Sequence, residues 1–435
     1  MITTKYVRDN VERIRESLER RRSNYPLDEL LKLDEQSRAI QTKVQELRKK
    51  RNAGSIEVSN ARKEGKKVAD SRIRELADVK KEIEELEAKD AAGRERIDSL
   101  LWNMPNVLDE SVPYGKDETG NVEIRKAGAV KKRSIPSHIE ILERLGLVDI
   151  EQAAKVSGAR FYYLKGELAL LEQALIRFAI DRMVAKGYEL IAPPLMLKKE
   201  YYRGATALGD FEEALYKVAD TAESAAKKDF ERLEDELFLI STSEHTLAAL
   251  NAGRVFSGGE LPKRYVAVSP CFRREAGSHG KDTKGIFRVH HFYKIEQFAL
   301  SRQEDSPKMF DELLGNAEGL WKELGMPYHV INICTGDIGT VAAKKHDIDV
   351  YMPGQDRYRE VVSGSNCTDW QSLRLDIKYD EKGERRYAHT LNCTAIATSR
   401  ALVAMVENYY TDKGTIKVPE ALVPYMNGKR EIGKA

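Results

Sequence analysis

Helical spacing of apolar side chains dominates the N-terminal quarter of the chain. Over residues 5–22 the apolar positions lie three or four apart, namely Val7, Val11, Ile14 and Leu18. This spacing predicts a short amphipathic helix, which the turn-forming "SNYP" then ends. Two longer segments, 27–64 and 72–101, alternate steps of three and four along a seam. The seam positions are Leu30, Leu33, Ser37, Ile40, Val44, Leu47, Arg51, Gly54 and Val58, then Leu76, Val79, Ile83, Leu86, Asp90, Gly93, Ile97 and Leu100.

The two long segments predict a single antiparallel coiled coil. A three/four alternation is the a/d pattern of paired helices, although polar residues interrupt both seams. The connection "KEGKKVADS" is short, so the two helices must fold back on each other. At ~1.5 Å per residue, such an arm is roughly 50 Å long.

The surface of this arm is basic in places. Acidic residues are interleaved with the cations, so an ordinary solvated coiled-coil surface explains the charge as well as a phosphate-binding face does. The cations of interest are Arg48, Lys49, Arg51, Lys63, Lys66, Lys67 and Arg72.

The pattern changes after the arm. Residues 103–121 are rich in Pro, Asn, Asp and Gly, which is typical of a linker. Further on, "LALLEQALIRFAIDRMVAKG" predicts a helix, and "YELIAPPLML" predicts a strand that two prolines stop. Residues 219–236 form a polar insertion to which we assign no function. We therefore expect an N-terminal domain over 1–104, a linker region over 105–149 and a larger domain over 150–435.

The stretch "CFRREAGSHGKDTKGIFRVHHFYKIEQF" predicts two strands joined by a long basic loop. Since alternate strand residues share a face, Arg273 groups with Glu275 on the first strand. On the second strand the shared face carries Arg288, His290, Phe292, Lys294, Glu296 and Phe298. Charges are not gathered on a buried face without a partner. The face is therefore either exposed and laced with ordinary salt bridges, or it binds a polar, anionic ligand.

Composition narrows the function classes. The 435-residue chain is 41% hydrophobic and 33% charged, yet its formal net charge is only +2. Any contact with nucleic acid must therefore come from local patches. The four cysteines form no CxxC pair and accompany no histidine cluster, so we expect no zinc site and reduced thiols in a cytoplasmic protein. No signal peptide or membrane-spanning run is recognisable, so we expect no membrane partner.

Three segments of the second half together resemble the signature motifs of class II aminoacyl-tRNA synthetases. They are "YELIAPPLM", the charged two-strand stretch, and "RYAHTLNCTAIATSRALVAMVENY", a strand that runs into a helix. The sequences "TSE" at 242–244, "REVVSGSNCTDWQSLR" and "HTLN" are similar to those of seryl-tRNA synthetases. "NICTGD" and "SNCTDWQ" resemble the archaeal-type branch, and the coiled-coil arm is that family's hallmark. The resemblance covers essentially the whole chain.

The resemblance implies an α+β fold, in which a long antiparallel two-helix coiled coil precedes a catalytic domain built on an antiparallel sheet flanked by helices. It also implies a serine–tRNA ligase. Such an enzyme activates L-serine with ATP to seryl-adenylate and transfers serine to the 3′-terminal adenosine of serine tRNA. Selenocysteine tRNA is a further acceptor to consider. We also expect a homodimer, because class II synthetases of this type pair through the first motif.

By the same resemblance, Arg273 holds the α-phosphate of ATP and Arg400 the γ-phosphate, which makes these two the catalytic pair. An arginine suits the role because its planar fork binds oxygen pairs. Glu275 reads the adenine amino group, Phe292 stacks on adenine, and the Val289 backbone supports the base. Glu360 and Ser363 match the Mg²⁺ positions, although a salt bridge from Glu360 to Arg357 or Arg359 is the plain alternative. The ATP set is Arg273, Glu275, Arg288, Val289, Phe292, Glu360, Ser363 and Arg400.

The serine set implied by the family is Thr242, Glu244, Arg273, Glu296, Asn392 and Thr394. Glu296 would hold the amino group or the hydroxyl, and Thr394 the hydroxyl. A pocket that hydrogen-bonds a hydroxyl rejects alanine, because its buried polar groups are then left unpaired. For tRNA, the family implies the arm cations together with Lys281 and Lys284 of the basic loop.

Two other functions remain open from the sequence. One is a synthetase-like ligase that loads a small amino acid onto a carrier protein, and such relatives are expected to lack the arm. The other is a catalytically silent binding protein, which is expected to lose charged residues that are present here. Two stretches depart from the family pattern: His290–His291 where many members have His-Gln, and "CTAIATSR", without glycines, in what we take as the third-motif helix.

Overall fold

The protein is described by a computed structural model that covers residues 3–65, 67–207, 214–218, 236–275 and 285–433. The chain divides into two compact units, residues 1–107 and residues 108–435. The polar insertion at 219–236 lies outside the described residues except for Glu236.

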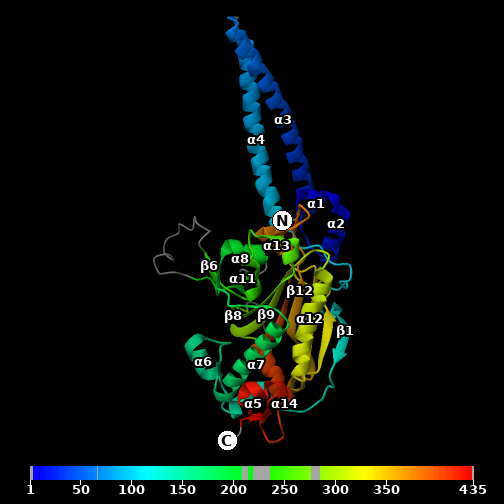
Figure 1. Cartoon of the computed structure of the whole chain (residues 1–435), viewed down its shortest axis with the longest axis vertical. Helices are drawn as coiled ribbons and strands as arrows, with labels where there is room; N and C mark the ends of the chain where they lie inside the picture. Colours follow the sequence, from blue (N-terminus) through cyan, green and yellow to red (C-terminus); the bar gives the residue numbers. More distant parts are fainter. Residues whose placement is uncertain (1–2, 66, 208–213, 219–235, 276–284, 434–435) are drawn as a thin grey trace. The chain divides into compact units, whose positions relative to one another are not determined.

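The first unit contains the predicted coiled coil. Helices α3 (Leu27–Lys63) and α4 (Asp70–Asn103) run side by side as two long helices (Figure 1). Ser37 and Asp90, both polar breaks in the seam, meet across it, because Ser37 Oγ donates a 2.6 Å hydrogen bond to Asp90 Oδ1. Farther along, the seam is apolar and contains Ile40, Val44, Leu47, Val79, Ile83 and Leu86. The predicted arm is confirmed.

The helix expected over residues 5–22 is wrong as a single element. The structure has two helices there, α1 (Thr4–Asp9) and α2 (Val11–Arg20). Asn10 interrupts them with φ −132° and ψ 30°, and its side-chain amide donates to the Tyr6 carbonyl at 2.9 Å. Such local side-chain bonds compete with a continuous helix, which explains why apolar spacing alone did not reveal the break.

The second unit is built on an eight-stranded sheet with the order β1-β10-β11-β12-β15-β9-β8-β4. All neighbours are antiparallel except β4 and β8, which are parallel. The strands are β1 (Val122–Ala127), β10 (Tyr328–Asn332), β11 (Lys344–Met352), β12 (Arg357–Asn366), β15 (His389–Ala397), β9 (His291–Ser301), β8 (Lys263–Phe272) and β4 (Glu189–Ile191). The predicted architecture, a mostly antiparallel sheet with flanking helices, is confirmed.

Helices α7 (Gly166–Ala185), α12 (Ser306–Glu323) and α14 (Thr398–Tyr409) form the main core with the sheet (Figure 1). On β9 the alternation of side chains sends Ile295 and Ala299 into this core. Lys294 and Glu296 lie on the other face and line a cavity. At Lys294 and Glu296 the sheet is therefore charged on the side opposite these helices, whereas Phe298 and Leu300 on that same side belong to a second apolar cluster.

Shorter elements complete this unit. Residues 105–149, which the composition marks as a connection, contain β1 and α5. The helices are α5 (His138–Arg144), α6 (Ile150–Ser157), α8 (Lys199–Ala205), α11 (Ser243–Ala249) and α13 (Trp370–Leu375). The strands are β2 (Val148–Asp149), β3 (Tyr163–Leu164), β5 (Met196–Lys198), β6 (Leu237–Leu239), β7 (Val255–Ser257), β13 (Lys378–Glu381), β14 (Glu384–Tyr387), β16 (Ile416–Lys417) and β17 (Glu431–Ile432).

Two expectations about strand limits are wrong. Strand β8 ends at Phe272 and β9 begins at His291, so Arg273, Glu275 and Arg288 do not belong to strands. Glu275 has φ 47°, and this left-handed conformation ends the alternation that the pairing with Arg273 assumed. Arg160 holds the turn by donating to the Glu275 carbonyl at 2.9 Å.

The third-motif stretch also differs from the expectation. Cys393 and Ala395 lie in strand β15, and the helix α14 begins only at Thr398. Both residues are fully buried in the main core. The positions where the family pattern has glycines therefore lie in strand β15 and not in the helix. There the small side chains of Cys393 and Ala395 fill space between the sheet and its helices.

Candidate active site

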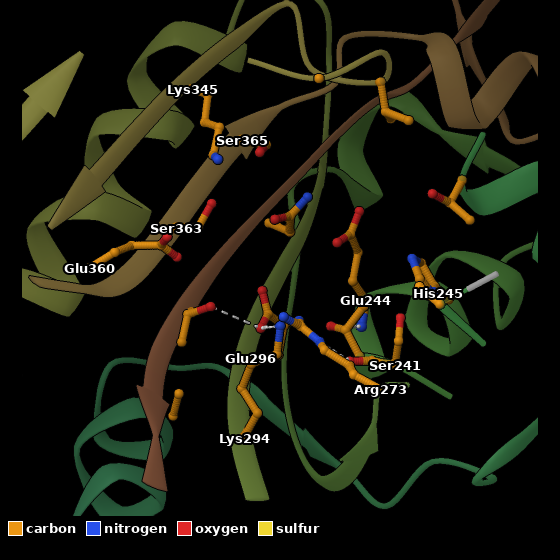
Figure 2. A pocket seen from close by; sticks show the side chains of 18 of the residues that line it. Ser241, Glu244, His245, Arg273, Lys294, Glu296, Lys345, Glu360, Ser363 and Ser365 are labelled. Atoms are coloured by element: carbon orange, nitrogen blue, oxygen red, sulfur yellow. Dashed lines mark hydrogen bonds and ion pairs between the residues drawn. The ribbon is translucent and has the colours of Figure 1, made fainter. Parts of the chain in front are cut away.

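A cavity of about 530 Å³ opens on the charged face of the sheet (Figure 2). Strands β9, β11, β12 and β15, the start of α11 and the segment 337–342 contribute to its wall. Every residue predicted to bind ATP, serine or metal lines it. These are Thr242, Glu244, Arg273, Glu275, Arg288, Val289, Phe292, Glu296, Glu360, Ser363, Asn392, Thr394 and Arg400.

Buried charge lies at the β9 wall of the cavity. Lys294 Nζ lies 2.5 Å from Glu296 Oε2, and both side chains are less than a tenth exposed. Thr394 on the neighbouring strand β15 donates a 3.3 Å hydrogen bond to the same carboxylate oxygen. Burial raises the pKa of Glu296 above its ordinary value, although the Lys294 ammonium opposes the shift. The arrangement offers a carboxylate and a hydroxyl to a small polar ligand.

Glu244 is a second, half-buried carboxyl group on the opposite side of the cavity from Glu360 and Ser363 (Figure 2). It follows Thr242, whose hydroxyl caps α11 by accepting from the Glu244 backbone N–H at 3.2 Å. Burial, together with repulsion from Glu296, raises the pKa of Glu244 to about 7. Gln371 donates to its Oε1 at 2.8 Å and favours the charged form. Glu244 therefore changes charge near neutral pH.

The Arg273 guanidinium is held at the cavity wall by the backbone. Its Nε donates to the Ser241 carbonyl at 3.3 Å, and its Cζ lies 5.4 Å from the Phe292 ring centroid. Both contacts fix the orientation of the guanidinium beside an aromatic ring. Arg288 lies near Glu275, with a distance of 3.8 Å between Nε and Oε2.

Glu360 and Arg400 form an ion pair in the same cavity. Arg400 Nη1 lies 3.0 Å from Glu360 Oε1 and also donates to the Glu360 carbonyl at 2.9 Å. Surrounding protein partly desolvates Glu360, but the cations of Arg400 and Lys345 outweigh this and hold its pKa below the ordinary value. The side chain is still 46% exposed, because it faces the cavity. The carboxylate is thus ionised and accessible.

Sequence reasoning missed Lys345 and Asp347 on β11. Their side chains form an ion pair with 3.3 Å between Lys345 Nζ and Asp347 Oδ2, and Asp347 accepts a hydrogen bond from Ser363. Asp347 is 3% exposed, and burial raises its pKa. The alternation in "KKHDIDVY" puts both residues on one face, but only the pairing of Asp347 with Ser363 on β12 reveals which face.

The residues present fit a magnesium ion. The Glu360 carboxylate and the Ser363 hydroxyl line one cavity, and Asp347 Oδ1 is buried without a hydrogen-bond partner in the structure. All three supply hard oxygen atoms, which Mg²⁺ prefers. Among the described residues, no group of three or more His, Cys, Asp or Glu side chains is arranged to hold a metal ion alone.

Further residues of the cavity were not predicted. Phe287 packs beneath two cations, with Arg359 Cζ 4.0 Å and Arg400 Cζ 5.1 Å from its ring centroid. His245 is buried against Tyr202, and burial lowers its pKa to about 3, so its imidazole is neutral. The "TGDIGTVA" segment contributes residues 337–342 to the wall, although its sequence was used only to assign the family branch.

The described residues among those predicted to bind tRNA are not among the residues that line this cavity. The arm cations lie on α3, on α4 and in the connection between them, and Lys66, Lys281 and Lys284 lie outside the described residues. Among the arm cations that the structure describes, Arg48 pairs with Glu87 at 2.7 Å, and Arg72 pairs with Glu57 and Glu75 at 2.6 Å. Part of the basic surface is therefore neutralised within the arm.

The sequence led us to expect reduced cysteine thiols and no membrane-spanning segment. Cys271, Cys334, Cys367 and Cys393 are all described and buried, and none of them forms a disulfide. Within the described part of the chain, no helix combines the length and the apolar character that crossing a membrane requires.

Comparison with known proteins identifies the family and the fold. Residues 216–409 match the tRNA synthetase class II core domain (G, H, P, S and T), so the cavity lies in a class II aminoacyl-tRNA synthetase core. Residues 1–108 match the seryl-tRNA synthetase N-terminal domain. The chain belongs to the seryl-tRNA synthetase family.

Individual relatives cover nearly all of the chain. A serine–tRNA ligase of Methanocella arvoryzae is 46% identical over 98% of this chain and 99% of its own. The crystal structure of seryl-tRNA synthetase from Pyrococcus horikoshii complexed with ATP has a TM-score of 0.92 at 43% identity and covers 99% of both chains. The cytoplasmic serine–tRNA ligase of Naegleria fowleri in complex with AMP has a TM-score of 0.87 at 36% identity, covering 98% of this chain and 96% of its own.

Proposed function

We propose that the protein is a serine–tRNA ligase, which forms seryl-adenylate from L-serine and ATP and transfers serine to the 3′-terminal adenosine of serine tRNA. The observation that carries the proposal is the convergence of all predicted ATP, serine and metal residues on one cavity. The full-length relatives named serine–tRNA ligase and the solved relatives that hold ATP or AMP support it.

The ATP half of the site is the cationic one. Arg273 would bind the α-phosphate and the serine carboxylate, and Arg400 the γ-phosphate. The transition state spreads negative charge over phosphoryl oxygens, so fixed cations and positioning supply most of the catalysis. Phe292 would stack on adenine and Glu275 would read its amino group, with Arg288 and the Val289 backbone beside them.

Glu360 and Ser363 would hold Mg²⁺, with Asp347 behind Ser363. When bound, the ion supplies positive charge to the phosphates and orients them. The ionised Glu360 carboxylate, shared with Arg400, supports this assignment. We assign no zinc to the protein.

The serine half lies around Glu244 and Glu296. The buried carboxyl group of Glu296 and the half-buried one of Glu244 suit an ammonium, and the Thr394 hydroxyl suits the serine hydroxyl. Asn392 and Thr242 would complete the pocket. Alanine would leave Thr394 and Glu296 without their ligand, and threonine would be excluded by space.

The remaining assignments concern the whole enzyme. The cations of the arm would bind phosphates of serine tRNA. Such contacts position the tRNA but do not distinguish its bases. Lys281 and Lys284 would approach the acceptor end, and selenocysteine tRNA is a second candidate acceptor. The protein would act as a cytoplasmic homodimer, with a tRNA-binding domain over 1–104 and a catalytic domain over 150–435.

The test is ATP–pyrophosphate exchange without tRNA against each of the twenty amino acids. Exchange with serine alone, dependent on Mg²⁺, supports the proposal. Exchange with another small amino acid keeps the chemistry but overturns the serine pocket. No exchange with any amino acid points to a silent binding protein. A ligase for a carrier protein is disfavoured by the arm of α3 and α4, and serine transfer to tRNA would dismiss it.

A further inference from the structure

A second cavity of about 430 Å³ adjoins the active site. Consecutive residues divide between the two cavities: Ala214 and Arg273 line the first, whereas Leu215 and Arg274 line the second. The Arg274 backbone N–H donates to the Ala214 carbonyl at 2.9 Å, which ties the two walls together. The second cavity is lined by Lys199, Leu215, Tyr216, Lys217, Glu236, Phe238 and Arg274.

The second cavity combines positive charge with an aromatic ring. Among the described residues of its lining, three are cations, Lys199, Lys217 and Arg274, and one is a carboxylate, Glu236, so two positive charges are in excess among them. Glu236 lies 3.3 Å from Lys199 Nζ and also pairs with Lys217. Leu215 and Phe238 are buried and form an apolar floor.

Tyr216 supplies the aromatic part of the wall. Its ring lies edge-on to the His290 ring, with 6.3 Å between the centroids, so the aromatic group is fixed in place. Cations that follow a phosphate backbone, combined with a ring on which a base stacks, are the elements of single-strand recognition. Neither element alone would specify a nucleotide.

We propose that this second cavity binds a nucleotide of the single-stranded 3′ end of tRNA, upstream of the terminal adenosine. The proposal rests on the proposed function, because the terminal adenosine must reach the adenylate beside Arg273. The nucleotides before it must then pass along the adjoining wall, where Arg274 follows Arg273 in the chain. Arg274 contacts a phosphate and Tyr216 stacks on a base.

The test compares serine tRNA with the same tRNA trimmed of its single-stranded 3′ end. Wild-type protein is expected to bind the intact tRNA more tightly, and Arg274→Ala should weaken intact binding about tenfold while trimmed binding stays equal to wild type. Loss of one phosphate contact should also lower the slope of log affinity against log salt by about 0.7. Arg274→Lys should restore most of the slope, and Tyr216→Phe should bind as wild type where Tyr216→Ala does not.

Matched measurements separate this proposal from its alternatives. Arg177→Ala, which removes an exposed cation paired with Asp181 on α7, should leave intact and trimmed binding unchanged. Serine-dependent exchange without tRNA should stay within twofold of wild type for Arg274→Ala. A large loss of exchange would assign Arg274 to positioning Arg273 and overturn the proposal. Equal weakening for intact and trimmed tRNA would also overturn it, by placing the contact on the duplex.

Failure of the proposed function would look different. Wild-type protein would then show no serine-dependent exchange and no tRNA charging, whatever the state of Arg274. The last comparison is between the two variants of the cavity. If Arg274→Ala weakens binding of intact tRNA and Tyr216→Ala does not, the cavity holds an anion alone and the nucleotide assignment is overturned.

Discussion

Glu360 on β12 and Arg400 on α14 lie within ion-pair distance, with 3.0 Å between Oε1 and Nη1. The residue proposed to hold Mg²⁺ and the residue proposed to hold the γ-phosphate therefore stand side by side. Mg²⁺ takes oxygen ligands such as the Glu360 carboxylate, and a phosphate held by that ion would also lie within reach of the Arg400 guanidinium.

Glu360→Gln tests the metal assignment. The amide keeps the size of the side chain but removes its negative charge, so the Mg²⁺ concentration for half-maximal exchange should rise at least about tenfold. A magnesium titration of serine-dependent exchange measures this, and addition of EDTA should abolish exchange in wild type. Glu384→Gln on β14, an exposed carboxylate paired with Arg386, is the control and should leave the titration unchanged. An unaltered titration in Glu360→Gln would remove Glu360 from the metal site.

Arg273→Ala tests the catalytic assignment. Since this guanidinium is expected to meet the charge that develops on the α-phosphate, exchange should fall about 10²–10³-fold. Arg273→Lys keeps the charge but loses the planar fork, so its activity should lie between that of the wild type and that of Arg273→Ala. Thermal unfolding of both variants serves as the control for folding. Near-normal exchange in Arg273→Ala with an unchanged melting profile would show that another cation stabilises the charge on the α-phosphate.

The parts of the fold that follow local periodicity could be predicted from the sequence. The arm was evident because its seam repeats over many turns, and Ser37 opposite Asp90 shows that even its polar breaks are matched. The period-2 pattern of β9 correctly grouped Phe292, Lys294 and Glu296 at one cavity. Residue roles came instead from family resemblance, and they remain predictions.

Features that depend on neighbouring strands or on single backbone angles could not be predicted. Lys345 and Asp347 alternate like many strand residues, and only the placement of β11 beside β12 brings them to Ser363. The left-handed conformation of Glu275 has no sequence signal of the kind a glycine would give. For the same reason the limits of β8 and β9 were placed too far into the loop.

Serine binding should depend on pH through Glu244. Its pKa of about 7 means that the carboxyl group is mostly neutral at pH 6 and mostly ionised at pH 8. Because the serine ammonium prefers a carboxylate, the KM for serine should rise as pH falls, by up to about tenfold per unit below 7. Exchange measured from pH 6 to 8.5 at saturating ATP tests this.

The control for this prediction is Glu244→Gln, which is neutral at every pH. Its KM should be higher and nearly flat across the range, whereas an unchanged slope would assign the titration to Glu296 or another group near Lys294 and Arg273. The raised pKa of Glu244 also determines how this residue changes the stability of the folded protein with pH. A carboxyl group whose folded pKa is raised binds its proton more tightly when folded, so it stabilises below its unfolded pKa of about 4.5 and this stabilisation is lost as pH rises through about 7.

Shortening the arm tests its role in tRNA binding. Removing residues 42–85 and closing the gap with a short glycine-rich turn keeps the Ser37–Asp90 hydrogen bond. The base of the unit is also kept, including the 2.6 Å ion pair of Arg8 with Asp34 and the hydrogen bond from the Tyr25 hydroxyl to the Leu100 carbonyl. Serine-dependent exchange should stay normal, while the KM for tRNA in charging should rise at least about tenfold as several phosphate contacts disappear.

A second variant separates loss of charge from loss of the helices. Lys49, Lys63 and Lys67 lie outside the heptad seam, so changing all three to alanine should preserve the coiled coil. If these residues contact phosphates, the variant should raise the KM for tRNA and reduce its dependence on salt, with helical content unchanged by circular dichroism. Charging that survives the shortened arm with an unchanged KM would contradict the role of the arm. A loss confined to the shortened arm would instead assign recognition to its shape rather than to these cations.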